Sequence, residues 1–397
     1  MKSLDVLISG AGVAGPALAF WLLRWGFRPT LIEQASHLRT DGYVIDFWGV
    51  GYDVAERMGI LPRLHTVGYQ VDAVRLVDRT GRRVGGFGGR LFRSATRDRF
   101  VSLPRGDLAR EIFRTIENRV EVIFGDSIRA IRDDGSGVEV AFGRSPPRRF
   151  DLVVGADGMH SSVRALLFGE DARFFRYLGY GVAAFTSAGY PHRDENAYVS
   201  YAAPGRQIGR FALRDGRTAF FLIFTDKDGL HVQRHDHERQ RRLLRRTFDD
   251  AGWEAKEVLA ALDDCATLYF DAVSQVRLDK WSKGRVVLLG DAGFCPSLLA
   301  GQGAALAMTG AYVLAGELWR AAGDHAIGFD RYEQRLRPLI LAKQKSAGAF
   351  GRWLAPRTER GIWLRNQLTR LIEVPYVSDL VARRMVDDRL TLPAYDG

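Results

Sequence analysis

Three glycines near the start of the chain have the spacing of a phosphate-binding loop. Gly10, Gly12 and Gly15 form the pattern GxGxxG directly after an apolar run, residues 5–9. In such a loop the first glycine permits a tight turn, the second lets the main chain approach a pyrophosphate, and the third lets a helix pack closely on a strand. The free N–H groups at the start of that helix would face the phosphate oxygens. The pattern therefore predicts a dinucleotide-binding site.

The residues around the glycines predict a strand, a helix and a second strand, in that order. Residues 5–9 are typical of a buried parallel strand, and residues 16–25 have apolar side chains at helical spacing. Residues 30–32 predict a second strand that ends at Glu33. An acid in this place can accept a hydrogen bond from a ribose hydroxyl. We therefore expect Glu33 to contact an adenosine ribose, and this unit by itself fits FAD and NAD equally well.

Two later segments repeat the pattern of a strand that ends in a Gly/Asp turn. Residues 150–154 lead into the sequence GADG, and residues 284–289 lead into the sequence GD. A further short motif, GQG, precedes a helix expected over residues 304–319. Ligands bind at the carboxyl edge of a parallel sheet, where such turns meet. We therefore expect the three turns to surround one ligand.

Together these motifs resemble the group A flavoprotein monooxygenases, the family of para-hydroxybenzoate hydroxylase. Three signatures mark that family: GxGxxG, a DG motif and a GD motif. Here they are residues 10–15, 155–164 and 290–303, and the resemblance covers residues 5 to about 320. The segment 41–46 and the helical tail look most similar to tetracycline-inactivating and polyketide-tailoring hydroxylases. The resemblance implies non-covalently bound FAD as the cofactor and NAD(P)H as a transient reductant.

The resemblance also assigns cofactor contacts to residues of each motif. Glu33 would hold the ribose, Arg105 would reach the flavin side chain, and Asp291 would contact the ribityl chain. Arg39 would lie near the ribityl and phosphate groups, and Asp157 would serve both FAD and NAD(P)H. The cofactor-binding candidates are Gly10, Gly12, Val13, Ala14, Gly15, Glu33, Gln34, Arg39, Arg105, Asp157, Gly158, Asp291, Gly301, Gln302, Gly303 and Ala304.

The loop before the last of these glycines departs from the family at two positions. By resemblance, the N–H groups of residues 301–304 would lie beside the flavin ring, where a helix N-terminus stabilises negative charge. Many relatives have a histidine where this chain has Phe294, and many have a proline where it has Leu298. The first departure implies that this loop needs no imidazole. The second leaves the local backbone shape open, and neither removes FAD binding.

The order of the expected elements predicts an α/β fold with two domains and a helical tail. The first domain would be a Rossmann-like FAD-binding domain of the para-hydroxybenzoate-hydroxylase type, and the second an inserted antiparallel sheet that binds the substrate. The tail would pack across both domains, with a membrane-surface or dimer contact as the alternative. This expectation rests on an apolar stripe at helical spacing, formed by Leu354, Ile362, Trp363, Leu368, Leu371 and Ile372. The expected boundaries are 1–72, 96–172 and 281–330 for the first domain, 73–95 and 173–280 for the second, and 331–397 for the tail.

The substrate-binding sheet is expected from alternating residues that favour strands. Residues 198–225 contain three such segments, and an Asp-Gly hairpin signal separates the last two. Because alternate residues share a face, Phe220 and Phe224 would lie opposite Phe221. One face should lie over the flavin and line the substrate pocket. The candidate pocket residues are Tyr43, Asp46, Trp48, Phe185, Tyr201, Arg210 and Phe224.

The resemblance implies hydroxylation of an aromatic or polycyclic small molecule of polyketide or antibiotic type. NAD(P)H would reduce the flavin, O2 would add to it as a C4a-hydroperoxide, and the distal oxygen would pass to the substrate. The flavin carries this chemistry, so no catalytic side chain is assigned. Baeyer–Villiger or epoxidase chemistry on the same scaffold is an alternative. A non-catalytic FAD-binding protein that sequesters a substrate or senses redox state is another.

Composition excludes several other classes of protein. The chain has 397 residues, of which 46% are hydrophobic, so it can bury a core and is not a disordered chain. Lys and Arg number 57 and Asp and Glu 47, which gives a net charge of +10. The arginines are scattered and not gathered on one element, which disfavours nucleic-acid binding. Only Cys265 and Cys295 could bind a metal as thiolates, and no other metal-ligand pattern is present.

The most apolar long stretch of the chain is a poor membrane span. Residues 286–318 include Asp291, Pro296 and several glycines. The N-terminal apolar run is too short for the core of a signal peptide. We therefore expect a cytoplasmic protein that is a monomer or a homodimer.

Overall fold

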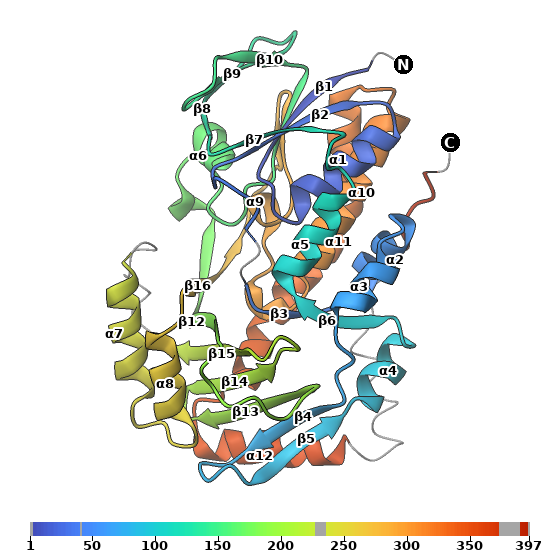
Figure 1. Cartoon of the computed structure of the whole chain (residues 1–397). Helices are drawn as coiled ribbons and strands as arrows, with labels where there is room; N and C mark the ends of the chain where they lie inside the picture. The colour runs from blue at the N-terminus through green and yellow to red at the C-terminus, as the bar shows by residue number, and fades with distance from the viewer. Residues whose placement is uncertain (1–2, 40–41, 227–235, 373–389, 396–397) are drawn as a thin grey trace.

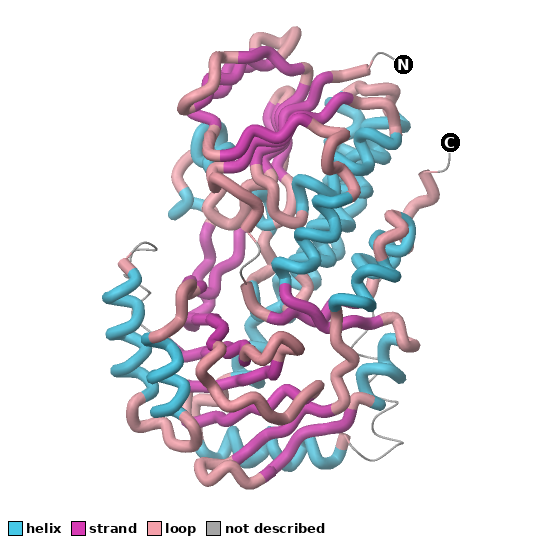
Figure 2. Tube along the Cα trace, in the orientation of Figure 1, coloured by secondary structure: helices cyan, strands magenta, loops and turns pink. Residues whose placement is uncertain are grey.

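The computed structural model describes residues 3–39, 42–226, 236–372 and 390–395 (Figure 1). Two large sheets lie at opposite ends of the molecule, and long helices run alongside them from one end toward the other (Figures 1 and 2).

The first sheet carries the glycine turns. Its strand order is β17 (Ser282–Lys283), β18 (Val286–Leu288), β11 (Leu152–Gly155), β1 (Asp5–Ser9), β2 (Arg28–Glu33) and β7 (Glu121–Phe124). All neighbouring strands are parallel except β17 and β18. Ser9 pairs with both Gly155 and Ile32, and Gly155 pairs with Leu288. The three turns therefore lie side by side at the carboxyl edge, and the prediction that they meet there is confirmed.

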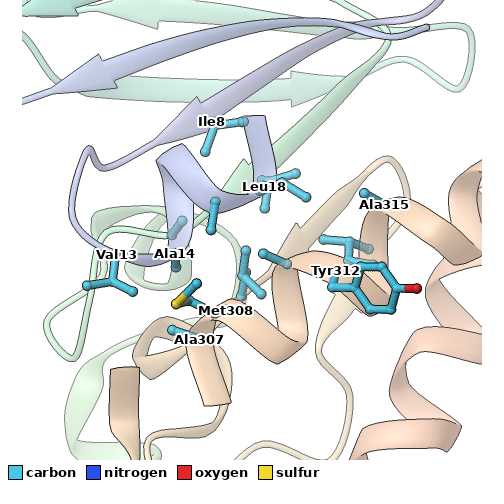
Figure 3. Close-up of a cluster of buried hydrophobic side chains, with 14 of the residues drawn as sticks. Ile8, Val13, Ala14, Leu18, Ala307, Met308, Tyr312 and Ala315 are labelled. Carbon is cyan, nitrogen blue, oxygen red and sulfur yellow. The ribbon is translucent and has the colours of Figure 1, made fainter. Parts of the chain in front are cut away.

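A shared core fixes the two helices that begin at this edge. α1 (Ala14–Arg24) packs against α10 (Gly303–Arg320), and α10 also contacts α2 (Val50–Arg57) and α11 (His325–Leu354). Small side chains at the contact let the helices approach closely. Figure 3 shows this core, with the labelled side chains Ile8, Val13, Ala14, Leu18, Ala307, Met308, Tyr312 and Ala315.

The second sheet has seven strands and is antiparallel apart from one pair. Its order is β16 (Tyr269–Val276), β12 (Phe175–Ser187), β15 (Thr218–Thr225), β14 (Arg206–Ala212), β13 (Ala197–Ala203), β4 (Ala73–Val77) and β5 (Arg83–Gly88). The strands β13 and β4 pair in parallel. The three central strands β13, β14 and β15 confirm the alternating segments expected from the sequence.

The two faces of the second sheet have different neighbours. α7 (His237–Phe248) and α8 (Ala255–Asp263) cover one face with a continuous apolar core. The other face packs with the two-stranded sheet of β3 (Val44–Trp48) and β6 (Phe100–Pro104) and with the loop that precedes α10. This second face therefore lies toward the carboxyl edge of the first sheet.

The C-terminal helices link the two sheets. α11 contacts α10 beside the first sheet, and near its end Gly351 lies against Tyr180 of the second sheet. α12 (Glu359–Leu371) then docks on β5. Residues 373–389 of the expected helical tail lie outside the described residues. Among the described helices, none has both the length and the apolar character that crossing a membrane needs.

α12 turns its polar side toward the protein. The expectation that its apolar stripe faces the core is confirmed at Ile362 but wrong at Trp363, Leu368 and Leu371, which are exposed. The physical reason is a set of polar contacts with the second sheet. The Thr369 hydroxyl accepts a hydrogen bond from the main chain of β5, and other buried polar residues of α12 bond to neighbouring polar groups.

Shorter elements complete the described fold. A three-stranded sheet has the order β10, β9, β8. The bounds are α3 (Leu61–Val67), α4 (Arg90–Thr96), α5 (Arg105–Arg114), β8 (Ile128–Asp133), β9 (Val138–Phe142), β10 (Arg148–Phe150), α6 (Ser162–Phe168), α9 (Asp291–Phe294) and the 3₁₀ turns η1 (Asp171–Arg173) and η2 (Leu298–Ala300).

Two glycines form a matched pair for testing the contact between α2 and α10. A Cβ atom at Gly51 would lie 2.4 Å from the Cα atom of Ala305, whereas one at Gly348 of α11 would meet no atom within 4 Å. Alanine is favoured over glycine in a helix by about 1 kcal/mol. We therefore expect Gly348→Ala to raise the free energy of unfolding by up to about 1 kcal/mol. Gly51→Ala should lower it by about 2 kcal/mol, since the helices must move apart.

Urea unfolding followed by circular dichroism measures both changes. Effects of the same sign and size in the two variants would contradict the described contact between α2 and α10.

Candidate functional site

The glycine loop has room for a ligand at its second glycine. A Cβ atom at Gly10 would lie 2.6 Å from the carbonyl oxygen of Ala156, and one at Gly15 would lie 1.9 Å from that of Gly10. A Cβ atom at Gly12 would come no nearer than 4.0 Å to the Nη2 atom of Arg105. The first and third glycines thus allow close packing of main chains. The second faces the space where a pyrophosphate would lie.

The carboxylate of Glu33 binds the main chain of two turns. It accepts hydrogen bonds from the N–H groups of Ala11 and Ala35, each at 2.9 Å. The guanidinium of Arg39 lies 3.2 Å from the same carboxylate. Glu33 is buried, whereas Gln34 and Arg39 are exposed. Glu33 therefore holds the glycine loop to the end of β2, and Arg39 lies at the end of the site predicted for the ribose.

Arg105 places a positive charge beside the glycine loop. It is the first residue of α5, and its N–H donates to the carbonyl oxygen of Tyr43 at 3.0 Å. Its guanidinium lies next to Gly12 and takes part in no ion pair within the described part of the chain. An arginine that lacks an acidic partner can bind phosphate oxygens in a bidentate manner.

Asp157 caps a helix. Its carboxylate accepts hydrogen bonds from the hydroxyls of Ser161 and Ser162 and from the N–H groups of Ser162 and Val163, at the start of α6. The fully buried Arg164 then donates to the carbonyl oxygen of Ala292 at 2.7 Å. These contacts join the DG and GD motifs. The cofactor role expected for Asp157 stays a prediction.

The start of α10 contains a buried donor without an acceptor. Gln302 precedes the helix, and its Nε2 atom is buried with no hydrogen-bond partner among the described residues. Gly303 lies beside Asp291, whose Oδ1 atom would be 3.8 Å from a Cβ atom there. Burial raises the pKa of Asp291, and the charge of Arg105 opposes this shift. An unsatisfied amide at the N-terminus of an 18-residue helix fits an acceptor-rich ring.

These features fit FAD. The sheet order β18, β11, β1, β2 places the start of α10, the glycine loop and Glu33 in one line along the edge. A flavin ring, a pyrophosphate and an adenosine ribose follow one another in the same order in an extended FAD. Of the other candidates, Val13, Gly158 and Gly301 lie in the same turns, and Ala14 and Ala304 lie in the first turns of α1 and α10.

The loop before α10 is held in an unusual conformation. Ser297 is 1% exposed and has φ 106° and ψ 145°, a region that residues other than glycine rarely adopt. Its hydroxyl accepts a hydrogen bond from the N–H of Leu299. Leu298, the second departure from the family, begins the turn η2 next to this residue. Phe294, the first departure, packs against Trp281 with a ring-centroid distance of 4.4 Å and belongs to the core.

Aromatic side chains of the second sheet face this edge. The rings of Phe221 and Tyr269 lie 5.8 and 5.5 Å from the ring of Tyr43. Burial raises the pKa of Tyr43 to about 12 and raises that of Tyr269, and the charges of Arg105 and Asp291 act on both. All three aromatic residues nevertheless keep accessible surface. The three side chains are therefore packed by protein without being fully enclosed, and they lie next to the predicted ring end of the site.

Four predicted pocket residues lie on the other face of the second sheet. Phe185, Tyr201 and Phe224 pack into the core beneath α7 and α8. Arg210 is 5% exposed and pairs with Glu254 at 3.0 Å on that same side. The structure contradicts a pocket role for these four residues, because the sheet separates them from Tyr43. Alternation predicted two faces correctly but did not indicate which face the helices cover.

Asp46 and Trp48 lie in β3 and keep accessible surface. The hydroxyls of Ser102 and Tyr198 both donate to the Oδ1 atom of Asp46, at 2.5 and 3.0 Å. The Lys343 ammonium lies 5.8 Å from the centre of the Trp48 ring. Sequence reasoning missed Ser102, Tyr198, Phe221 and Tyr269. The alternation of residues could have indicated Phe221, because it places Phe221 on the face opposite Phe224. No local pattern could have indicated Ser102, since the pairing of β3 with β6 brings it to Asp46.

Neither cysteine belongs to a disulfide, and both are buried. Within the described ranges, no three histidine, cysteine or acidic side chains lie close enough together to share a metal ion.

A family model described as an FAD binding domain matches residues 3–342. The chain belongs to this family, the group A flavoprotein monooxygenases. This flavoprotein monooxygenase therefore uses FAD as its cofactor, and the resemblance drawn from the three motifs is confirmed.

Curated relatives cover nearly the whole monooxygenase. A flavin-dependent monooxygenase of Legionella longbeachae serogroup 1 (strain NSW150) is 34% identical over 406 residues, which cover 100% of this chain and 99% of the relative. The FAD-dependent monooxygenase asL4 of Sarocladium schorii is 28% identical and is matched over 94% of this chain and 93% of its own.

Solved structures show the same α/β fold. The tetracycline destructase Tet(51) has 31% sequence identity and a TM-score of 0.83, with 99% of this chain and 100% of that chain covered. Klebsiella pneumoniae HpxO, solved with FAD and uric acid, has 23% identity and a TM-score of 0.79, with 96% of each chain covered. The second likeness concerns the fold alone. The predicted fold class is confirmed.

Replacing Arg105 should weaken FAD binding. Arg105→Met keeps a long side chain but removes the charge beside Gly12. We expect the dissociation constant for FAD to rise roughly tenfold to a hundredfold, as for a lost charge-assisted hydrogen bond. Quenching of flavin fluorescence on titration of the apoprotein measures it. The control is Arg110→Met on the same helix, where the arginine pairs with Asp107. An FAD affinity that both variants lower equally would contradict the assignment.

Replacing Asp46 should stabilise the apoprotein in a pH-dependent manner. Burial raises the pKa of Asp46, so the folded state favours the protonated form. The ionised form therefore lowers stability above the folded pKa, and this penalty disappears as the pH falls toward the ordinary value of about 3.9. We expect Asp46→Asn to raise the Tm at pH 8 and to raise it less at pH 5.

The matched control is Asp215→Asn, because Arg217 lowers the pKa of this exposed aspartate. Its Tm should fall or stay the same at pH 8. A gain for Asp46→Asn that is independent of pH would count against the burial argument. Differential scanning fluorimetry measures all three proteins.

Proposed function

We propose that the protein hydroxylates an aromatic or polycyclic small molecule, with NAD(P)H as the reductant and O2 as the source of the oxygen atom. One observation supports the proposal most strongly. The aromatic face of the second sheet, with Phe221 and Tyr269, borders the same space as Asp291 and the start of α10. A ring bound there would lie beside the predicted position of the flavin.

The residues that would hold the cofactor follow from the site. Glu33 would bind the ribose, and the N–H groups after Gly12 together with Arg105 would bind the pyrophosphate. The start of α10, with the Gln302 amide, would bind the ring. The chemistry that bound FAD supplies is acceptance of a hydride from NAD(P)H and activation of O2.

The chain's own side chains would control charge and water. The N-terminus of α10 would stabilise negative charge on a reduced ring, because its N–H groups point outward. The rings of Tyr43, Phe221 and Tyr269 would exclude water from the substrate, which keeps the reducing equivalents from being lost to solvent. With their pKa values raised by burial, the tyrosine hydroxyls stay protonated and can donate hydrogen bonds.

The likeness to tetracycline destructases supports a polycyclic substrate. Their full-length match includes the second sheet, where the aromatic wall lies. A pocket whose wall consists of several aromatic rings suits a flat, fused-ring ligand.

The visible spectrum of the purified protein is the first test of this function. We expect flavin absorbance that bleaches slowly with NADPH in air and several-fold faster when the correct phenolic polycycle is present. Mass spectrometry after reaction under labelled O2 should show one labelled oxygen atom in the product.

Three results would separate the parts of the proposal. A colourless protein that cannot be reconstituted with FAD would overturn the cofactor assignment. If the protein contains flavin but no aromatic compound in a broad panel accelerates its reaction with NADPH, the proposed substrate class is wrong. Two labelled oxygen atoms, or label only from water, would overturn monooxygenation.

A further inference from the structure

Asp46 is an acid of β3 that contacts the second sheet and has no cationic partner among the described residues. Its hydrogen bonds within the described residues come from the hydroxyls of Ser102 and Tyr198. Burial raises its pKa, and the hydrogen bonds from Ser102 and Tyr198 oppose this shift. Desolvating a carboxylate without a cation is unfavourable. In a chain with 57 lysines and arginines, such an acid is a candidate for a ligand contact.

The second oxygen of Asp46 is available to a ligand. Both donors bind Oδ1, and no hydrogen bond within the described residues reaches Oδ2. Oδ2 is not fully buried, so it keeps accessible surface. Ser102 is fully buried, and the ring of Tyr198 lies 4.7 Å from that of Phe211. The carboxyl group is therefore fixed by two positioned donors, and its second oxygen is not fully enclosed.

Asp46 and Tyr43 contact the same face of the second sheet at two places. Asp46 contacts Tyr198 of β13, and Tyr43 contacts Phe221 of β15. One strand, β14, lies between them, and Phe221 is two residues further along the sheet than Tyr198, so their main chains are about 12 Å apart. The residue of β14 paired with Phe221 is Gly209, which has no side chain, and a Cβ atom there would lie 3.4 Å from the Ser200 hydroxyl oxygen. A ligand that reached both Asp46 and Tyr43 would need about this length, which a flat molecule of several fused rings has.

We propose that Asp46 contacts the substrate directly and accepts a hydrogen bond from a hydroxyl or enol group of an uncharged fused-ring aromatic compound. This inference rests on the proposed function of the pocket. A substrate carboxylate in the same place would meet the charge of Asp46 and would be repelled. Ser102 and Tyr198 are positioning residues, because they act through Asp46. The specificity is therefore for a hydroxyl over a carboxylate on the same ring system.

Binding of two matched probes tests the inference without turnover. 2-Naphthol and 2-naphthoate share one ring system and differ in the group offered to Asp46. Equilibrium dialysis against the FAD-loaded protein at neutral pH and 0.15 M salt gives both dissociation constants from probe fluorescence. We expect the wild-type protein to bind 2-naphthol at least tenfold more tightly than 2-naphthoate.

Two variants and a control test whether the preference for 2-naphthol over 2-naphthoate comes from the Asp46 carboxylate. Asp46→Asn keeps the acceptor for Ser102 and Tyr198 but presents a neutral amide, so the ratio should fall below threefold. Tyr198→Phe removes one positioning donor and should weaken 2-naphthol alone, by threefold to tenfold. Asp215→Asn makes the same chemical change on a surface hairpin and should leave the ratio as in the wild type.

Equal binding of the two probes by the wild-type protein, or no binding of either, would overturn the inference. So would an unchanged ratio in Asp46→Asn. If that variant does not fold, the wild-type ratio and Tyr198→Phe still decide. Failure of the proposed function would instead appear as loss of flavin absorbance or of NADPH oxidation, which dialysis does not measure.

Discussion

The close approach of two main chains at the carboxyl edge of the first sheet determines the rest of the site. The turn after β1 passes so near the turn after β11 that Gly10 has no space for a side chain, and Gly15 lies even closer to the main chain of Gly10. This packing fixes the direction of α1 relative to β1. Since α1 and α10 share a core, it also fixes where α10 begins (Figure 3). The phosphate end and the ring end of the cofactor site thus depend on one contact.

Hydrogen bonds then join the second sheet to the same edge. Gln275 of β16 donates to the carbonyl oxygens of Pro296 and Gln344, at 3.1 and 2.6 Å. Gln344 of α11 donates back to the carbonyl oxygen of Val276 at 2.9 Å. All of these groups are buried, where unpaired amides and carbonyls are costly. The aromatic wall therefore keeps a defined distance from the loop before α10.

The cofactor half of the site could be predicted from the sequence because its signals are local. Each turn follows directly on its strand, and Gly10, Glu33 and Asp291 lie at strand ends that the strand order then aligns.

The pocket half could not be predicted in the same way. Alternation separated Phe221 from Phe224, but only tertiary packing shows that α7 and α8 cover Phe224. Asp46 and its donor Tyr198 are 152 residues apart, a pairing that no local pattern contains. In α12 the expected apolar stripe was misleading, because hydrogen bonds and not burial of leucines dock that helix.

The conformation of Ser297 limits which residues this position accepts. A residue other than glycine in that region of φ and ψ carries about 1–3 kcal/mol of strain. Glycine would remove the strain, but it would also remove the hydroxyl that accepts from the N–H of Leu299. A β-branched side chain would add steric conflict to the strain. The backbone conformation therefore determines which residues position 297 tolerates. Fewer substitutions are acceptable there than the small polar side chain of Ser297 would suggest.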